Sequence, residues 1–277
     1  MSMDLIFWGV RGTFPALEKD RARYGGHTTC AAIRLGPGAY LVVDAGTGLR
    51  DLGERIMAEA GRGDIRVDLL LTHFHLDHIV GFPFFAPLFS PRTELTVHAP
   101  GDPKDTEAAL AGLMAGRYFP VDLGRTAARK TFRGFKQGLT VGGVRASSCP
   151  LRHPQGSVAY RLEAGGSSLV LTTDTEHPED GVDGRLAEFA ADADWLVYDA
   201  MYTPAEYAAG KRGWGHSTWL AGTELAASAR AGSLVLSHFN PSHTDADVDA
   251  IVEAARERFP RTFAAAQGRG PGTSLPS

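Results

Sequence analysis

The sequence is poor in cysteine, with two among 277 residues, and it lacks a basic N-terminal region followed by a long apolar stretch. Two thiols without paired spacing give no disulfide framework, which is typical of proteins from a reducing compartment. The missing leader pattern argues against secretion and against membrane insertion. We therefore predict a cytoplasmic protein that has no membrane partner.

An excess of positive charge is also missing, since the net charge is −4 and the isoelectric point is about 6.2. Proteins that neutralise many nucleic-acid phosphates usually carry a basic face, so a large nucleic acid is not expected as a partner. The one dense basic run comprises Arg125, Arg129, Lys130, Arg133 and Lys136. This run could guide a phosphate toward a site or form ordinary solvated surface, and both interpretations stay open.

The sequence does contain enough apolar residues for one large core, and no segment resembles a linker. We predict a single domain over residues 1–267 and a flexible C-terminal tail over residues 268–277, which are rich in glycine, proline and serine. Apolar runs of strand length and periodic segments predict alternating strands and helices. The strands are expected at residues 4–8, 30–35, 40–44, 67–72, 94–98, 139–149, 157–163, 168–173, 194–199 and 233–238, and the helices at residues 48–60, 105–116, 184–191, 217–231 and 244–258.

The segment from His73 to His78 reads His-Phe-His-Leu-Asp-His and directly follows an apolar run. Imidazole nitrogens and carboxylate oxygens are ligands that suit zinc and similar divalent ions. Side chains alternate along an extended segment, so His73 and His75 share one face, and the turn that follows can bring Asp77 and His78 to the same space. The segment therefore predicts a metal site rather than a histidine-rich surface loop.

Other apolar runs also end in residues that could bind a metal or move a proton. The residues in question are Asp44, His153, Asp174, Asp199 and His238, each at or shortly after the end of a predicted strand. Ligands at strand ends gather on one edge of a sheet, where layered α/β proteins place their sites. We therefore expect these side chains to converge with the histidine motif.

The order of these residues along the chain resembles that of the metallo-β-lactamase superfamily. That superfamily has a His-x-His-x-Asp-His motif followed by a later histidine, an aspartate and a final histidine. The resemblance covers roughly residues 4 to 266 and implies an α/β fold, a four-layer αββα sandwich of two mixed β-sheets flanked by helices. It also implies two divalent metal ions, zinc first, with manganese or iron as alternatives. One ion would be held by His73, His75 and His153, the other by Asp77, His78 and His238, with Asp174 as the bridge. A hydroxide between the two ions would then attack the substrate.

The element Gly215-His216-Ser217-Thr218 resembles the phosphodiesterase branch of that superfamily, which contains ribonuclease Z. In this branch an acidic residue pairs with the histidine of the His-Ser-Thr element. Here the pair would be Asp199 and His216, with aspartate where ribonuclease Z usually has glutamate. The resemblance makes Asp77, Asp199 and His216 catalytic candidates, with His216 also contacting the substrate. The alternative is that Ser217 only caps a helix and that His216 is solvated.

The segments Phe7 to Thr13 and Tyr24 to Cys30 are similar to a bacterial subgroup of cyclic-nucleotide phosphodiesterase-like hydrolases. That subgroup usually carries asparagine at the position of His27. His27 is therefore either a substrate-binding candidate or part of a tight turn before the next strand. Asp44 could orient a metal-binding histidine or belong to a plain strand-to-helix turn.

The remaining histidines are His98, His177 and His243, and we predict that none of them binds metal. His98 falls inside a predicted strand, whereas the other two fall in a loop and at a helix start.

Substrate size follows from a second comparison with ribonuclease Z. That enzyme grasps transfer RNA with a long arm inserted between the later histidine and the bridging aspartate, and only twenty residues separate His153 from Asp174 here. We expect a dinuclear metal-dependent hydrolase, a phosphodiesterase for a small phosphodiester such as a cyclic nucleotide or cyclic phosphate. The alternatives are a ribonuclease for short RNA, a lactone or thioester hydrolase, and a metal-binding sensor without catalysis. The resemblance also suggests a homodimer.

Overall fold

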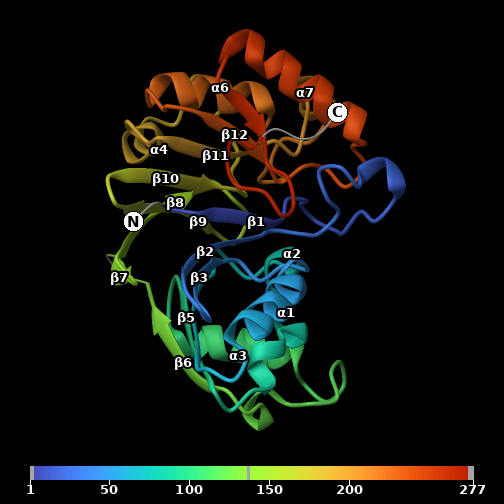
Figure 1. Ribbon diagram of the computed structural model, residues 1–277. Coiled ribbons are helices and arrows are strands. Elements are labelled where there is room, and N and C mark those ends of the chain that lie inside the picture. Colours follow the sequence, from blue (N-terminus) through green and yellow to red (C-terminus); the bar gives the residue numbers. More distant parts are fainter. Residues whose placement is uncertain (1–2, 136–137, 274–277) are drawn as a thin grey trace.

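Two mixed β-sheets face each other, and helices cover the outer side of each sheet (Figure 1). The computed structural model describes residues 3–135 and 138–273. The first sheet has the strand order β1 (Leu5–Gly9), β2 (Cys30–Gly36), β3 (Ala39–Val43), β4 (Ile65–Leu70), β5 (Thr93–Ala99) and β6 (Arg129–Gly134). The second sheet runs from β13 (Thr262–Ala264) through β12 (Leu234–Ser237), β11 (Trp195–Asp199), β10 (Ser167–Thr172), β9 (Ser157–Ala164) and β8 (Val144–Leu151) to β7 (Leu139–Val141).

Each sheet combines a parallel part with an antiparallel part. In the first sheet β3 to β6 are parallel, while β1 and β2 are antiparallel to their neighbours. In the second sheet β10 to β13 are parallel and β7 to β10 are antiparallel. The parallel strands point their carboxyl ends to one edge, because each returns through a connection that crosses the sheet face.

The central strands are apolar because both of their faces are covered. All four residues of β12 are buried, as are the last four of β3 and of β10. Strands buried on both faces lose the alternation of apolar and polar residues that marks a half-exposed strand. This is why short apolar runs located them in the sequence.

The helices lie on the outside of the sandwich. On the side of the first sheet are α1 (Leu49–Ala60) and α3 (Pro103–Leu113), and on the side of the second are α4 (Gly184–Phe189), α6 (Trp219–Ser228) and α7 (Asp245–Arg258) (Figure 1). Two shorter helices, α2 (Leu76–Ile79) and α5 (Pro204–Ala208), lie in the loops at the sheet edge. The 3-10 turns are η1 (Lys19–Arg21), η2 (Phe82–Phe84), η3 (Ala86–Phe89) and η4 (Leu123–Arg125).

The core has two parts. One lies between the first sheet and its helices and includes Leu52, Val67 and Leu110. The other lies between the two sheets and under α6 and α7, and includes Leu41 and Tyr160. The hydroxyl of Tyr160 donates to the carbonyl of Leu71 at 2.8 Å, so the second sheet is tied to the backbone just ahead of the histidine motif.

One predicted element was wrong, and strand β6 was not predicted. The strand expected at residues 139–149 is a hairpin of β7 and β8, turned at Gly142 and Gly143, whose φ angles of +54° and +84° suit glycine. The basic run was not predicted as a strand, but Arg129, Lys130 and Arg133 lie in β6, an edge strand of the first sheet. Charged side chains are common on edge strands, where they oppose pairing with another chain. Lys136 of that run lies outside the described residues.

The predicted tail starts with residues held against β1. Gly268 N donates to the carbonyl of Phe7 at 2.7 Å, and Phe7 N donates to the carbonyl of Arg269 at 2.9 Å. Residues 274–277 lie outside the described residues, and the domain boundary at residue 267 stays a prediction. Among the described residues, no helix combines the length and apolar character that crossing a bilayer requires.

Candidate metal centre

The predicted ligands meet at the edge where the parallel strands end. Asp44 follows β3, the histidine motif follows β4, and Asp174, Asp199 and His238 follow or end β10, β11 and β12. Three of these residues have a left-handed backbone, with φ of 60° at Asp44, 60° at Asp174 and 59° at His238. Such a conformation costs about 1–2 kcal/mol in a residue with a side chain. A positive φ occurs at all three strand ends. The tertiary fold therefore directs these side chains toward the site although the backbone conformation is locally unfavourable.

One group of ligands consists of imidazoles only. Potential ligand atoms of His73, His75 and His153 lie within 4.8 Å of one another. His153 Nε2 and His75 Nδ1 are 3.0 Å apart, and the opposite nitrogen of each ring is held by protein. Gly215 O accepts from His153 Nδ1 at 2.7 Å, and Gln155 Oε1 accepts from His75 Nε2 at 3.0 Å. These outer contacts fix the tautomers and leave lone pairs that face the centre of the group.

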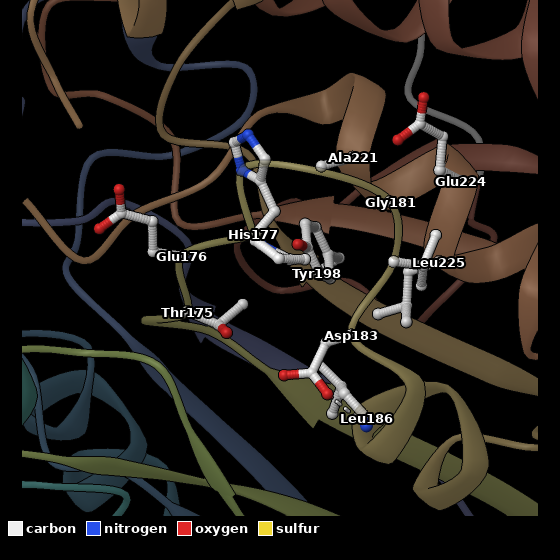
Figure 2. Close-up of a pocket in the computed structure, with 12 residues that line it drawn as sticks. Thr175, Glu176, His177, Gly181, Asp183, Leu186, Tyr198, Ala221, Glu224 and Leu225 are labelled. Carbon is white, nitrogen blue, oxygen red and sulfur yellow. Dashed lines mark hydrogen bonds between the residues drawn. The ribbon is translucent and has the colours of Figure 1, made fainter. Parts of the chain in front are cut away.

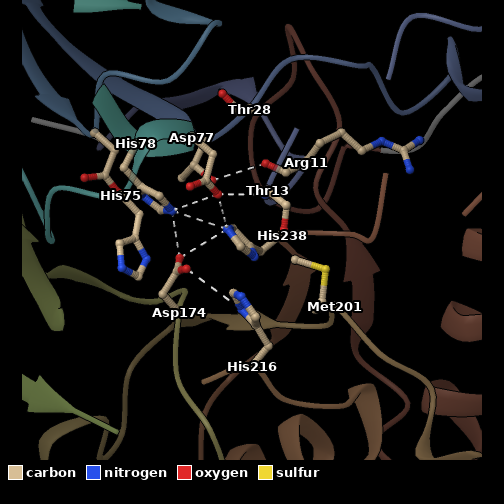
Figure 3. Close-up of polar contacts among 12 residues, drawn as sticks. Arg11, Thr13, Thr28, His75, Asp77, His78, Asp174, Met201, His216 and His238 are labelled. Carbon is tan, nitrogen blue, oxygen red and sulfur yellow. Dashed lines mark hydrogen bonds and ion pairs between the residues drawn. The ribbon is translucent and has the colours of Figure 1, made fainter. Parts of the chain in front are cut away.

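The second group is buried and contains two carboxylates. Asp77, His78, Asp174 and His238 again place ligand atoms within 4.8 Å of one another. Figure 3 shows these four side chains pointing toward a common centre. Asp44 Oδ2 accepts from His78 Nδ1 at 2.8 Å, so the Nε2 atom of His78 faces the group. That Nε2 atom is only 3.3 Å from Nε2 of His238.

Asp174 faces both groups. Its Oδ2 atom lies 2.9 Å from His78 Nε2 and 3.2 Å from His238 Nε2, whereas Oδ1 lies 3.7 Å from His153 Nε2 and 3.8 Å from His73 Nε2. One carboxylate therefore presents an oxygen to each group, as the predicted bridging role requires.

The donor set suits divalent cations. Asp44, Asp174 and Asp199 are at most 1% exposed and Asp77 is 9% exposed, and buried carboxylates need paired charges or metal ions. His73 Nε2 is also buried without a hydrogen-bond partner among the described residues. Burial, helped by neighbouring imidazoles, lowers the pKa of His73, and burial lowers the pKa of His153. Metal ligation needs the neutral imidazole, so these surroundings favour it.

The predicted pair of Asp199 and His216 lies beside these groups. His216 Nδ1 donates to Asp199 Oδ2 at 3.0 Å. The His216 ring stacks on that of His238 with centroids 5.2 Å apart, and Figure 3 shows both side chains. Asp199 also accepts from the backbone N–H groups of Asp174, Met201 and Ser217. Burial opposes the charged form of His216, but the carboxylates of Asp199, Asp174 and Asp77 together outweigh it and raise the pKa of His216 to about 9. His216 Nε2 is the ring nitrogen left for contact with a ligand.

Ser217 is not the helix cap that the alternative interpretation required. The cap of α6 is Thr218, whose hydroxyl accepts from Ala221 N at 3.2 Å. Ser217 Oγ instead lies 2.8 Å from His177 Nδ1 and 2.9 Å from the Tyr198 hydroxyl. Figure 2 shows His177 and Tyr198 beside a small hollow next to α6. The side chain of His216 is only 13% exposed, so it is not a solvated residue at a helix start.

His27 does not join either group of ligands. Its Nδ1 atom lies 3.0 Å from Thr47 Oγ1 and its Nε2 atom lies 3.3 Å from Asp51 Oδ2. Both ring nitrogens thus face side chains of the segment that leads into α1 and of its first turn. The role of His27 in substrate binding stays a prediction.

The other histidines have partners away from the predicted ligands. His98 Nε2 lies 2.9 Å from Asp68 Oδ1, and His243 Nε2 lies 2.9 Å from Glu206 Oε1. Together with His177 they are absent from the clusters of potential metal ligands in the part of the chain that the structure describes.

Sequence reasoning missed several residues that shape the centre. Thr13 N donates to Asp77 Oδ2 at 2.7 Å, and Gly12 lies so close to His238 that a Cβ atom would be 2.3 Å from its Cε1. Gln155 and Gly215 hold His75 and His153 through the contacts given above. The contacts of Thr13 and Gly215 use backbone atoms, which leave no signal in the type of residue. Gly12 was visible in the sequence as part of the segment Phe7 to Thr13.

A family model for a β-lactamase superfamily domain matches residues 40–239 of this chain. The chain belongs to the β-lactamase superfamily. Ribonuclease Z of Bradyrhizobium diazoefficiens is 26% identical over 314 aligned positions, which cover 95% of this chain and 97% of the relative.

Solved structures of the superfamily agree with the fold. The metallo-β-lactamase fold protein YhfI from Bacillus subtilis superposes with a TM-score of 0.73 and 21% identity, covering 96% of this chain and 97% of that protein. A diphosphatase from the PhnP family gives a TM-score of 0.69 and 18% identity, covering 99% of both chains. The predicted fold of two mixed sheets flanked by helices is confirmed, as is the prediction of a metallo-β-lactamase superfamily hydrolase of the ribonuclease Z-like branch. The superfamily fold and the clusters of histidine and aspartate imply divalent metal ions.

Proposed function

We propose that this β-lactamase superfamily protein is a dinuclear metal-dependent phosphodiesterase that cleaves a small phosphodiester, such as a cyclic nucleotide or a cyclic phosphate. The observation that carries the proposal is the pair of His216 and Asp199, joined at 3.0 Å and placed against the predicted metal ligands. A hydrolase of lactones or thioesters would have no evident use for an imidazole whose charge is supported by a buried carboxylate.

The metal ions would occupy the two groups described above. His73, His75 and His153 would hold one ion, Asp77, His78 and His238 the other, with Asp174 shared. A bound divalent ion supplies Lewis acidity toward a phosphoryl oxygen and acidifies the water that it binds. Nitrogen and oxygen donors suit zinc, manganese and iron, and we propose zinc as the first choice because imidazoles form the majority of the ligands.

The side chains of this chain handle the protons of the reaction. A water molecule attacks phosphorus and releases a proton, for which the Asp77 carboxylate is the acceptor. The bond from phosphorus to the leaving alkoxide breaks, and His216 donates its Nε2 proton to that oxygen. Asp199 stabilises the charged imidazole before the transfer and keeps the ring oriented through Nδ1.

The short connection between His153 and Asp174 supports a small substrate. It consists mainly of β9 and β10, a tight hairpin whose turn contains Gly165 and Gly166 with φ of 58° and 82°. Two paired strands of the second sheet fill this segment and leave no length for a long arm that could hold transfer RNA. The alignment with the Bradyrhizobium relative spans 314 positions, more than the 277 residues of this chain, so some of its positions have no counterpart here.

The test is hydrolysis of bis-para-nitrophenyl phosphate by protein reconstituted separately with zinc and with manganese. A lactone and a thioester are assayed in parallel, and metal content is determined on the same samples. We expect phosphodiester turnover that needs about two metal ions per chain. Full metal occupancy with cleavage of the acyl compounds alone, or with no cleavage, would disprove the proposal.

A ribonuclease for short RNA is the second candidate, and the curated relative favours it. The Bradyrhizobium ribonuclease Z aligns with this chain over 97% of its own length. Cyclic nucleotides and a short single-stranded RNA separate the two candidates in one competition assay. Preferential cleavage of the RNA, with little turnover of cyclic nucleotides, would assign the chain to RNA processing.

A further inference from the structure

Glu176 connects three chain segments beside the metal centre. It lies two residues after Asp174, and both of its carboxylate oxygens accept hydrogen bonds. Oε1 accepts from the Tyr207 hydroxyl at 2.6 Å and from Gly213 N at 2.7 Å, and Oε2 accepts from Gly215 N at 2.9 Å. The backbone N–H of Glu176 donates to the carbonyl of Arg152 at 2.7 Å. In Figure 2 the Glu176 carboxylate lies on the opposite side of its loop from Glu224 and Leu225 of α6.

Gly215 carries this connection to a predicted metal ligand. Its N–H donates to Glu176, while its carbonyl accepts from His153 Nδ1 at 2.7 Å. The φ angle of Gly215 is +82°, and a Cβ atom there would be 2.2 Å from Pro154 Cδ and 2.4 Å from His153 Nδ1. The peptide of Gly215 thus fits between the carboxylate and the imidazole with no room for a side chain.

The same loop ends in His216. Because Glu176 holds the N–H groups of Gly213 and Gly215, it sets the course of the chain just before His216 enters its contact with Asp199. One carboxylate therefore restrains two groups that the proposed reaction needs: the His153 ring through a carbonyl, and the His216 ring through the backbone that carries it.

We propose that Glu176 is a positioning residue for metal binding and turnover, which acts through the Gly213 to Gly215 loop on His153 and His216. This inference rests on the proposed function, since it assigns His153 to a metal ion. The carboxylate keeps the Gly215 carbonyl directed at His153 Nδ1, so that His153 Nε2 stays available as a ligand. Removal of such an outer contact typically weakens metal affinity by 10–100-fold.

The experiment compares Glu176→Gln with Glu179→Gln in the full chain. In either orientation the amide introduced by Glu176→Gln would turn its NH2 group toward one backbone donor, Gly213 N or Gly215 N. Glu179 is exposed on the same loop and pairs with Arg212 at 2.5 Å. Zinc affinity of the metal-free protein is measured by competition with a chelator, and the visible spectrum of the cobalt-substituted protein reports ligand geometry. We expect zinc binding to weaken about 10–100-fold and the cobalt spectrum to change in Glu176→Gln only.

Tyr207→Phe should have a smaller effect, since it removes one of the three hydrogen-bond donors to Glu176 and leaves both backbone donors in place. Its zinc affinity should fall between those of the wild type and Glu176→Gln. Unchanged zinc affinity and an unchanged cobalt spectrum in Glu176→Gln would overturn the inference, even with lower thermal stability. These two readouts need no substrate, so they separate this inference from a failure of the phosphodiesterase proposal.

Discussion

The two groups of predicted ligands differ in both charge and burial. Asp77, His78, Asp174 and His238 are all buried and include two carboxylates, whereas His73, His75 and His153 are imidazoles of which only His73 is buried. Two negative charges shielded from water match a divalent cation, while the imidazole group has no carboxylate of its own and includes the partly exposed His75. We infer that the buried group binds its ion more tightly and that the open group exchanges its ion and admits the substrate.

The largest effect on metal binding and hydrolysis is expected from removing the charge that the two groups share. Asp174→Asn keeps the shape of the side chain, and asparagine tolerates the positive φ of this position better than most residues. We expect metal content to fall in both groups and hydrolysis to fall by at least about 10²–10³-fold, the usual effect of losing one electrostatic stabiliser. Metal analysis after dialysis measures the first effect and the phosphodiester assay measures the second. Retention of about two ions per chain by the variant would show that Asp174 does not bridge them.

A paired substitution tests the groups against each other. His78→Ala leaves the fully buried Asp44 without its imidazole, and breaking a buried charge pair costs about 3–5 kcal/mol. His153→Ala leaves only the Gly215 carbonyl, a neutral group, without its partner. We expect the first variant to lose metal and unfold at lower denaturant concentration, and the second to lose about one ion with a smaller change in the free energy of unfolding. Equal losses in the two variants would contradict the distinction between the groups.

His216 lies beside the two groups, and its role can be tested without removing any of the predicted metal ligands. Its Nδ1 is engaged by Asp199, so His216→Ala should lower phosphodiester hydrolysis about 10²–10⁴-fold, the usual contribution of a general acid, with metal content unchanged. The assay compares kcat and metal content on the same preparation. Joint loss of metal and activity would instead make His216 a ligand, since His153, Asp174 and His216 also form a potential metal cluster.

The smallest effect is expected at a residue that belongs to neither group. Arg133 is an exposed residue of the edge strand β6 and lines a hollow with Arg66 and His98. Arg133→Ala should change the free energy of unfolding by no more than about 0.5 kcal/mol and leave hydrolysis of a small phosphodiester unaffected. A clear rise in KM at low salt that disappears at high salt would show that the basic run guides the substrate after all.

The elements that could be predicted from the sequence include the strands that are buried on both faces. Buried strands such as β4, β10 and β12 consist of apolar runs because both faces are covered, and polar residues at their ends marked the edge of the sheets. The hairpin of β7 and β8 was missed although Gly142-Gly143 is a common hairpin turn, because β7 has only three residues and does not stand out as a separate strand. Strand β6 was missed because its sequence, Arg-Lys-Thr-Phe-Arg-Gly, contains a single apolar side chain and resembles solvated surface; every second residue of this edge strand is indeed exposed.

The sequence by itself determined the ligand chemistry, because the histidine motif puts four donors within six residues and the remaining donors each terminate an apolar run. It also determined that Asp199 and His216 are candidates for a pair. Only the tertiary structure decided which nitrogen of His75, His78 and His153 faces the centre, since contacts from Gln155, Asp44 and Gly215 select the tautomers. It likewise decided that His27 turns to Thr47 and Asp51 and that Glu176 holds the loop ahead of His216. Donor type is a property of one residue, whereas orientation and burial depend on segments that are distant in sequence and meet only in the folded chain.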